Sequence, residues 1–195
     1  FKTVTVGHLK QIDIPVEKWM LKGFAAPLIL TAEDFERSLD VFPLLFQEIR
    51  DNHKMIKGDD PFATLKIDRS LLRLQVEQML KGKVTEARTE FLASGESLKT
   101  FEAMIAKSFN SLYPVLRGLL SLTGKQPSIR KEVVVAMSEE AFGLETGVLT
   151  DALRHKMGLL RLSQKHNLLA YFERYLAAID KLAIVADKLE TAVGA

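Results

Sequence analysis

The sequence contains no cysteine among its 195 residues. This absence excludes disulfide bonds, thiolate metal sites and cysteine nucleophiles, and it fits a reducing compartment such as the cytoplasm. Net charge is also scarce, because 27 Lys and Arg face 25 Asp and Glu, so a net charge of +2 gives no signal for nucleic acid or a membrane surface. No apolar run approaches the roughly 20 residues that span a bilayer. What is present, 47% apolar residues with mixed charge, predicts a folded chain.

The N-terminal third mixes strand and helix patterns. Residues 1–6 alternate in polarity and residues 26–30 form a short apolar run, so both segments are predicted to be strands. Residues 15–22 and 31–39 have helical spacing, and the second of these segments opens with a threonine suited to an N-cap. Residues 42–57 begin with alternating apolar positions and favour a third strand. The order predicts a small, incomplete mixed β-sheet with packed helices, and therefore an α+β chain.

From residue 66 onward the pattern is helical and predicts a bundle of about five helices. We therefore divide the chain into residues 1–65, a partial α/β domain, and residues 66–195, a helical bundle. Asp68 and Ser128 are predicted N-caps, and Gly82 is expected where two helices pack closely. Tyr171 lies off the apolar stripe of the last helix and is expected to face a groove or a partner. Three apolar stripes are predicted to form the core: Leu72, Val76, Leu80, Val84, Ala87 and Phe91; Leu98, Phe101, Ile105, Phe109, Leu112, Leu116 and Leu119; and Leu168, Phe172, Tyr175, Ile179, Leu182, Ala186 and Leu189.

Several short motifs carry a resemblance to a known family. They are Ala26–Thr31, Ser38–Pro43, His53, Gly58–Asp60, Leu72–Glu77 and Leu80–Lys83. Together they resemble bacterial nucleotidyltransferase-like proteins of the DNA polymerase beta-like superfamily, over about residues 1–123. The resemblance implies a small mixed sheet followed by a helical bundle, with nucleotide as a partner.

The resemblance also shows that a catalytic element is missing. Such proteins carry a Gly-Ser turn and paired carboxylates that hold Mg²⁺ on a triphosphate, and this sequence has neither a Gly-Ser pair nor an Asp-x-Asp. Because the chain starts at Phe1 within a predicted strand, we expect a fragment or a diverged member without transferase activity. Mg²⁺ is expected only if an upstream motif exists. Glu48 is the remaining candidate catalytic carboxylate, and the alternative is a strand residue facing solvent.

A second candidate site lies on the first long helix. Arg73, Glu77 and Lys81 follow at intervals of four, so they share one helix face. The resemblance implies that this face helps to bind a nucleotide or substrate phosphate, flanked by Gln75, Gln78 and Lys83. The alternative is an exposed ladder of ion pairs, worth a few tenths of a kcal/mol per pair.

Two other functional classes stay open. A non-catalytic binding or scaffold protein would use the bundle seam for dimerisation, as a homo-oligomer. A ribonuclease similar to the helical HEPN enzymes would use Arg161 and His166, with histidine as the acid or base and arginine on the scissile phosphate. The other histidines, His8, His53 and His155, have no metal-ligand spacing, so no metal site is predicted.

Overall fold

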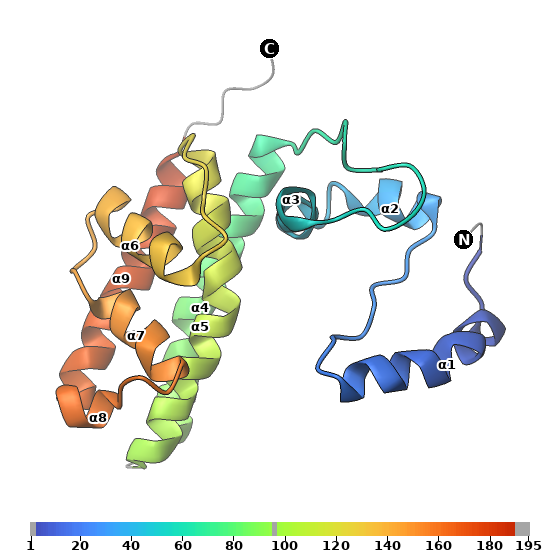
Figure 1. The fold of residues 1–195 in the computed structure, drawn as a ribbon. Helices are drawn as coiled ribbons and strands as arrows, with labels where there is room; N and C mark the ends of the chain where they lie inside the picture. Colours follow the sequence, from blue (N-terminus) through green and yellow to red (C-terminus); the bar gives the residue numbers. More distant parts are fainter. Residues whose placement is uncertain (1–2, 95–96, 190–195) are drawn as a thin grey trace. The chain divides into compact units, whose positions relative to one another are not determined.

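The computed structural model describes residues 3–94 and 97–189. Contacts divide the chain into two compact units, Phe1–Val41 and Phe42–Ala195, whereas the sequence pattern changes near residue 65. The described residues form helices and contain no strand (Figure 1). The helices are α1 (Val6–Leu21), α2 (Ala32–Ser38), α3 (Pro43–Asn52), α4 (Arg69–Ser94), α5 (Leu98–Leu122), α6 (Lys131–Ala141), α7 (Val148–Lys156), α8 (Leu162–Lys165) and α9 (Leu168–Lys188).

The α+β prediction is therefore wrong, and local interactions explain each misassigned strand. Residues 1–2 lie outside the described residues, but Thr5 caps α1 by accepting a hydrogen bond from the His8 backbone N–H at 3.3 Å. Residues 26–30 have no regular secondary structure. Pro43 starts α3, because its fixed φ suits a first helical turn, and Leu44 and Gln47 then share a buried face.

The smaller unit confirms the predicted helix at residues 31–39. The Thr31 side chain accepts from the Asp34 backbone N–H, and the Asp34 carboxylate accepts from the Thr31 backbone N–H, both at 3.0 Å. This reciprocal capping box satisfies two backbone donors that would otherwise lack partners at the start of α2. The helix predicted for residues 15–22 coincides with the second half of the longer α1 and with its C-cap residue, Lys22, and Pro15 lies in the interior of α1.

The larger unit is a bundle in which α4 packs most extensively against α5 and α9 (Figure 1). The three predicted apolar stripes form its core, which confirms that part of the prediction for the described side chains. Asp68 also caps α4 as predicted, since its carboxylate accepts from the Ser70 and Leu71 backbone N–H groups at 2.7 and 3.1 Å. The spacing of apolar residues along α4, α5 and α9 therefore suffices to predict which side chains form the core.

Glycine has different roles in the two long helices. A Cβ at Gly118 in α5 would lie 2.6 Å from Leu44 Cδ1 and 3.1 Å from Val76 Cγ2, so the missing side chain brings α5 against α3 and α4. The close-packing role that we predicted for Gly82 is wrong, because a Cβ there would meet nothing within 4 Å.

The connection from α5 to α7 differs from its prediction in detail. α6 begins at Lys131 with Arg130 at the N-cap position, and Ser128 instead accepts a hydrogen bond from the Arg130 backbone N–H at 3.1 Å. Glu139 is buried at the end of α6 and caps α7, because its carboxylate accepts from the Leu149 and Thr150 backbone N–H groups at 2.8 and 2.9 Å. Side-chain chemistry from another helix therefore sets where α7 begins.

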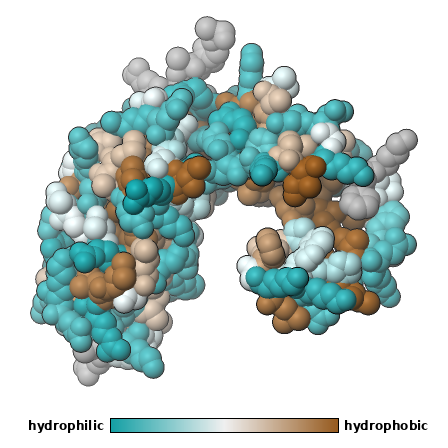
Figure 2. All heavy atoms as spheres, viewed as in Figure 1, coloured by the Kyte–Doolittle hydropathy of each residue, from teal (hydrophilic) through white to brown (hydrophobic). Residues whose placement is uncertain are grey.

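Tyr171 contradicts the expectation of a side chain facing a groove or partner. It is fully buried and its hydroxyl donates to the Val148 carbonyl at 2.7 Å. Figure 2 shows a mainly hydrophilic bundle surface with separate hydrophobic side chains. None of the helices in the described part of the chain is both long and apolar enough to cross a bilayer.

Candidate functional site

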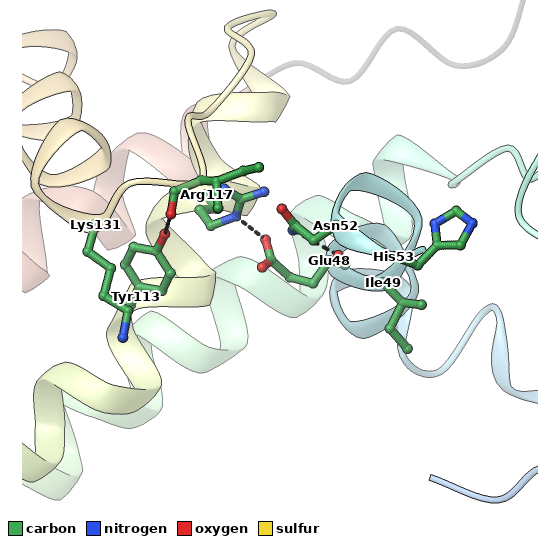
Figure 3. A pocket seen from close by; sticks show the side chains of 8 residues that line it. Glu48, Ile49, Asn52, His53, Tyr113, Arg117 and Lys131 are labelled. Atoms are coloured by element: carbon green, nitrogen blue, oxygen red, sulfur yellow. Dashed lines mark hydrogen bonds and ion pairs between the residues drawn. The ribbon is translucent and has the colours of Figure 1, made fainter. Parts of the chain in front are cut away.

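Glu48, the candidate catalytic residue, lies on α3 beside a hollow of about 470 Å³ in the larger unit. We call this space the α3–α5 hollow (Figure 3). It is lined by Glu48, Ile49, Asn52, His53, Tyr113, Arg117, Ile129 and Lys131. Its walls therefore come from α3 and the residue after it, from α5, from the connection between α5 and α6, and from the first residue of α6.

A buried ion pair joins the two helices at this hollow. The Arg117 Nε donates to Glu48 Oε1 at 2.5 Å (Figure 3), and Arg117 Nη1 donates to the Ser128 carbonyl. Arg117 is only 2% exposed. A guanidinium does not lose its proton in proteins, so Arg117 keeps its positive charge below the surface, and the Glu48 carboxylate balances it when ionised. The pair thus fixes α3 and the α5–α6 connection to the same side chain.

Burial raises the pKa of Glu48, and the hydrogen bond from Arg117 offsets only part of this effect. The ion pair with Arg117 occupies Oε1 of this carboxylate. Among the residues that the structure describes, no group of three or more His, Asp or Glu side chains could hold a metal ion. The structure thus gives Glu48 a role in joining α3 to α5, and its catalytic role stays a prediction.

Aromatic and aliphatic side chains supply the rest of the wall. The Tyr113 hydroxyl donates to the Ile129 carbonyl at 3.3 Å, which fixes the ring beside the connection to α6. The Lys131 ammonium lies 5.6 Å from the centre of the Tyr113 ring, a geometry typical of a cation–π contact. Ile129 is 78% exposed, so this apolar wall is open to a ligand.

A second hollow of about 390 Å³ lies next to the first and shares Asn52, Arg117 and Ile129 with it. We call it the basic hollow. Its other lining residues are Arg50, Asp51, Ser121, Lys125, Gln126 and Pro127. Two basic side chains, Arg50 and Lys125, therefore flank the buried Arg117. The apolar wall and the basic wall meet at one arginine, which a sequence pattern alone does not reveal.

The predicted cluster of Arg73, Glu77 and Lys81 does come together, but at the C-terminal end of α9. Glu77 accepts from Arg73 at 2.7 Å and from Lys81 at 2.5 Å, and the Lys81 hydrogen bond is the main cause of its lowered pKa. Arg73 Nη1 also donates to the Ala186 carbonyl at 3.3 Å, and Lys81 lies 3.6 Å from the Asp187 carboxylate. Basic side chains here stabilise the negative end of a helix. Nucleotide binding by this face stays a prediction.

The residues that we expected beside this cluster lie in different places. Gln75 accepts from the Leu44 backbone N–H at 2.8 Å and so caps α3, while Gln78 is exposed. Lys83 is buried and donates to Glu86 at 2.8 Å. They do not form one binding surface with the ion ladder.

His166, the ribonuclease candidate, contacts a different arginine from the one predicted. Its Nε2 lies 2.8 Å from Asp151 Oδ2, and its Nδ1 lies 3.2 Å from Arg174 Nη2. Lys165 also donates to the Asp151 carboxylate, at 2.7 Å. Arg161 precedes α8 as its N-cap residue. This network joins α7, α8 and α9, and it does not pair Arg161 with His166.

Burial opposes ionisation of Asp151, but the hydrogen bonds from Lys165 and His166 outweigh it and lower the pKa of this carboxyl. The ring of His166 also stacks on Tyr171, with ring centres 5.0 Å apart. These contacts favour a structural role for the network.

Comparisons with known proteins identify no relative: no protein-family model, no curated protein and no solved structure matches the chain. Arg117 is a residue of the site that the sequence analysis did not predict. One signal points to it, because Arg117 interrupts the apolar run Val115–Leu120 and a charge in such a run is expected to be buried with a partner.

Proposed function

We propose that this chain is a non-catalytic helical-bundle module that binds a small anionic ligand with an apolar portion. The observation that carries the proposal is the meeting of the α3–α5 hollow and the basic hollow at Arg117. A ligand that fills both would place its apolar portion against Ile129 and Tyr113 and its anionic group near Lys125. Ligand sites commonly combine apolar walls with a few polar groups that fix orientation.

Charge supports an anion rather than a cation. The lining of the two hollows includes four cations and two anions, so its net charge is +2 when His53 is neutral and +3 when His53 is protonated. The cations are Arg50, Arg117, Lys125 and Lys131, and the anions are Glu48 and Asp51. Lys125 and Lys131 are exposed, so they can reach a ligand. At ordinary salt the attraction acts within about 8–10 Å, which covers the site but not the whole bundle.

A nucleoside monophosphate has this chemistry, and nucleotide is the partner that the family resemblance implies. Group transfer is not part of the proposal, because the mixed sheet that the resemblance implied is absent from residues 3–94 and 97–189. The cysteine-free composition supports a cytoplasmic location for the module.

The bundle seam does not favour the dimerisation that we considered as an alternative. Tyr175, Ile179 and Leu182 of α9 are fully buried, since they pack within the chain. A homo-oligomer formed through the helical bundle stays a prediction.

Isothermal titration at low salt with AMP, adenosine and inorganic phosphate tests the proposal. We expect AMP to bind more tightly than either of the other compounds, because only AMP contacts both hollows. Equal affinity for AMP and phosphate would contradict the apolar part of the proposal. Absence of AMP binding at millimolar protein and ligand concentrations would refute the proposal for nucleoside monophosphates.

Matched lysine substitutions then test the location. Lys125→Gln should weaken AMP binding about twofold to fivefold, since an exposed charge pair is worth up to about 1 kcal/mol. Lys99→Gln provides the control, because it lies in the first turn of α5 and roughly 27 Å along the helix from Arg117. Equal losses in both variants would show non-specific attraction and contradict this site.

A further inference from the structure

His53 follows α3 and has a hydrogen-bond acceptor at each ring nitrogen. Its Nδ1 lies 3.0 Å from the Arg50 carbonyl oxygen, and its Nε2 lies 3.1 Å from each carboxylate oxygen of Asp60. A neutral imidazole has one N–H, whereas an imidazolium has two. Only the protonated ring therefore makes both hydrogen bonds, so this geometry favours the charged form of His53.

The Asp60 carboxylate is held in place for this contact. Its Oδ1 also accepts from the Phe62 backbone N–H at 2.8 Å, which is the main cause of the lowered pKa of Asp60. The Phe62 ring packs near the imidazole, with ring centres 4.9 Å apart. The hydrogen bond to Asp60 is the main cause of a raised pKa at His53, and the Arg50 carbonyl contributes in the same direction.

The same segment has a second attachment to α3, at the basic hollow. Arg50 Nη1 donates to the Leu65 carbonyl at 3.5 Å, and Arg50 is one of the cations that line this hollow. The segment Lys54–Ile67 is thus held at Asp60 by His53 and at Leu65 by Arg50. His53 itself lines the α3–α5 hollow, and Figure 3 shows it apart from Arg117.

We propose that His53 is a proton-operated latch that regulates the ligand site: when protonated it holds the segment Lys54–Ile67 on α3, and with it the position of Arg50. This inference rests on the proposed function for its effect on the ligand, and on the His53–Asp60 geometry for the latch itself. Deprotonation leaves one N–H on the ring, so His53 can then donate to the Arg50 carbonyl or to Asp60 but not to both, and a contact with Asp60 no longer involves a charged ring. The attachment of the segment at Asp60 is therefore weakened.

The surrounding charges in the larger unit act in both directions. Asp60 on the segment faces the ring and favours protonation of His53, as does the Arg50 carbonyl on α3. The α3–α5 hollow beside the ring is also lined by one anion, Glu48 on α3, and by two cations, Arg117 on α5 and Lys131 on α6. Tyr113 on α5 lines the same hollow. A bound anion adds negative charge and therefore favours the protonated latch. By linkage, protonation of His53 must strengthen anion binding by the same factor.

The sign of the pH effect follows from these contacts. The folded-state pKa of His53 lies above its unfolded value, so the stabilising contribution is complete below the unfolded pKa. It is lost as pH rises through the folded pKa. The affinity for an anion should likewise be higher below the folded-state pKa of His53 and should fall as pH rises through it.

An NMR titration of the full chain from pH 5 to pH 9 tests the latch without any ligand. The His53 ring should titrate above the ordinary histidine value of about 6.5, and the Phe62 amide should shift with the same midpoint. Asp60→Asn keeps an oxygen acceptor for Phe62 but removes the charge, so the His53 midpoint should fall. Asp59→Asn, an exposed neighbour, is the control and should leave the midpoint unchanged. A His53 midpoint at or below 6.5 in the wild-type chain, or a midpoint that Asp60→Asn leaves unchanged, would overturn the latch.

Titration with AMP at pH 6 and pH 8 then tests the regulation. The ratio of affinities at the two pH values should be larger in the wild-type chain than in Asp60→Asn, by roughly twofold to tenfold, because one pKa unit of linkage corresponds to tenfold. The comparison cancels the ionisation of AMP itself. Identical ratios with measurable binding would overturn the regulatory proposal. If AMP bound at neither pH, the regulation and the proposed function would both fail for this ligand class, while the NMR midpoint would still decide the latch.

Discussion

The substitution Gly118→Ala tests how closely α3 must pack on α5. An added Cβ would lie 2.6 Å from Leu44 Cδ1 and 3.1 Å from Val76 Cγ2, and both side chains are buried. The Leu44 methyl can move only by disturbing the core, and Val76 is β-branched and therefore stiff in a helix. Overpacking of this kind costs about 1–3 kcal/mol.

The same substitution has an opposing gain, because alanine is favoured over glycine in a helix by about 1 kcal/mol. We therefore expect Gly118→Ala to lower the free energy of unfolding by about 0–2 kcal/mol, the difference between these costs and gains. Gly82→Ala is the matched control, since a Cβ there meets nothing within 4 Å. This control should gain about 0.5–1 kcal/mol.

Urea denaturation followed by circular dichroism measures both variants, and melting gives a second readout. In a chain of this size, a change of 1 kcal/mol shifts the melting temperature by about 2–4 °C. Gly82→Ala should therefore raise the melting temperature, whereas Gly118→Ala should leave it unchanged or lower it. If Gly118→Ala stabilised the protein as much as Gly82→Ala, the close approach of α3 to α5 would be refuted. Leu44 precedes Glu48 by one helical turn on α3, and Glu48 lines the α3–α5 hollow. A Cβ at position 118 that displaces Leu44 should therefore also displace Glu48, so Gly118→Ala should weaken AMP binding.

Three further predictions concern buried polar groups. Glu139→Ala should cost about 2–4 kcal/mol in urea denaturation, because it removes a buried carboxylate that caps α7, while Glu140→Ala on the exposed face should change stability by less than about 0.5 kcal/mol. Gln47→Met should leave stability unchanged or raise it by about 1 kcal/mol, because the buried Gln47 Nε2 has no hydrogen-bond partner among the described residues; a loss above about 2 kcal/mol would contradict this. The folded-state pKa of Asp151 is lowered, so this carboxylate stabilises the protein above its unfolded pKa, and the contribution is lost as pH falls through the folded pKa. Asp151→Asn should therefore reduce the fall in the free energy of unfolding between neutral and acidic pH. An unchanged pH dependence would refute a stabilising role for the Asp151 carboxylate.

The candidate site was only partly accessible from sequence. Glu48 was selected because of a resemblance and was expected on a strand, whereas it lies on a helix in an ion pair with Arg117. Its partner is 69 residues away along the chain, and no local pattern specifies such a pairing. The Arg73–Glu77–Lys81 ladder was predictable, because residues four apart on a helix are neighbours. Its location at the end of α9 was not.

The partners of the histidines were also not predictable, although some of them are close in sequence. His53 and Asp60 are seven residues apart, so a turn could bring them together, but only the structure shows that both ring nitrogens face acceptors. For His166 the neighbouring Arg161 suggested a pair, and the structure pairs it with Arg174 instead. Proximity in sequence does not identify the partner when helices from other parts of the chain pack nearby.

The bundle could be predicted from local features of the chain, because apolar periods of three and four and the caps at Thr31 and Asp68 indicate the core and the starts of α2 and α4. Other features depend on contacts between distant segments. The short segments before residue 57 were ambiguous, because a few apolar residues fit either period, and Pro43 at the start of α3 mattered more than their alternation. The meeting of Glu48 with Arg117 likewise depends on the packing of α3 on α5, which long-range contacts specify and local periodicity does not.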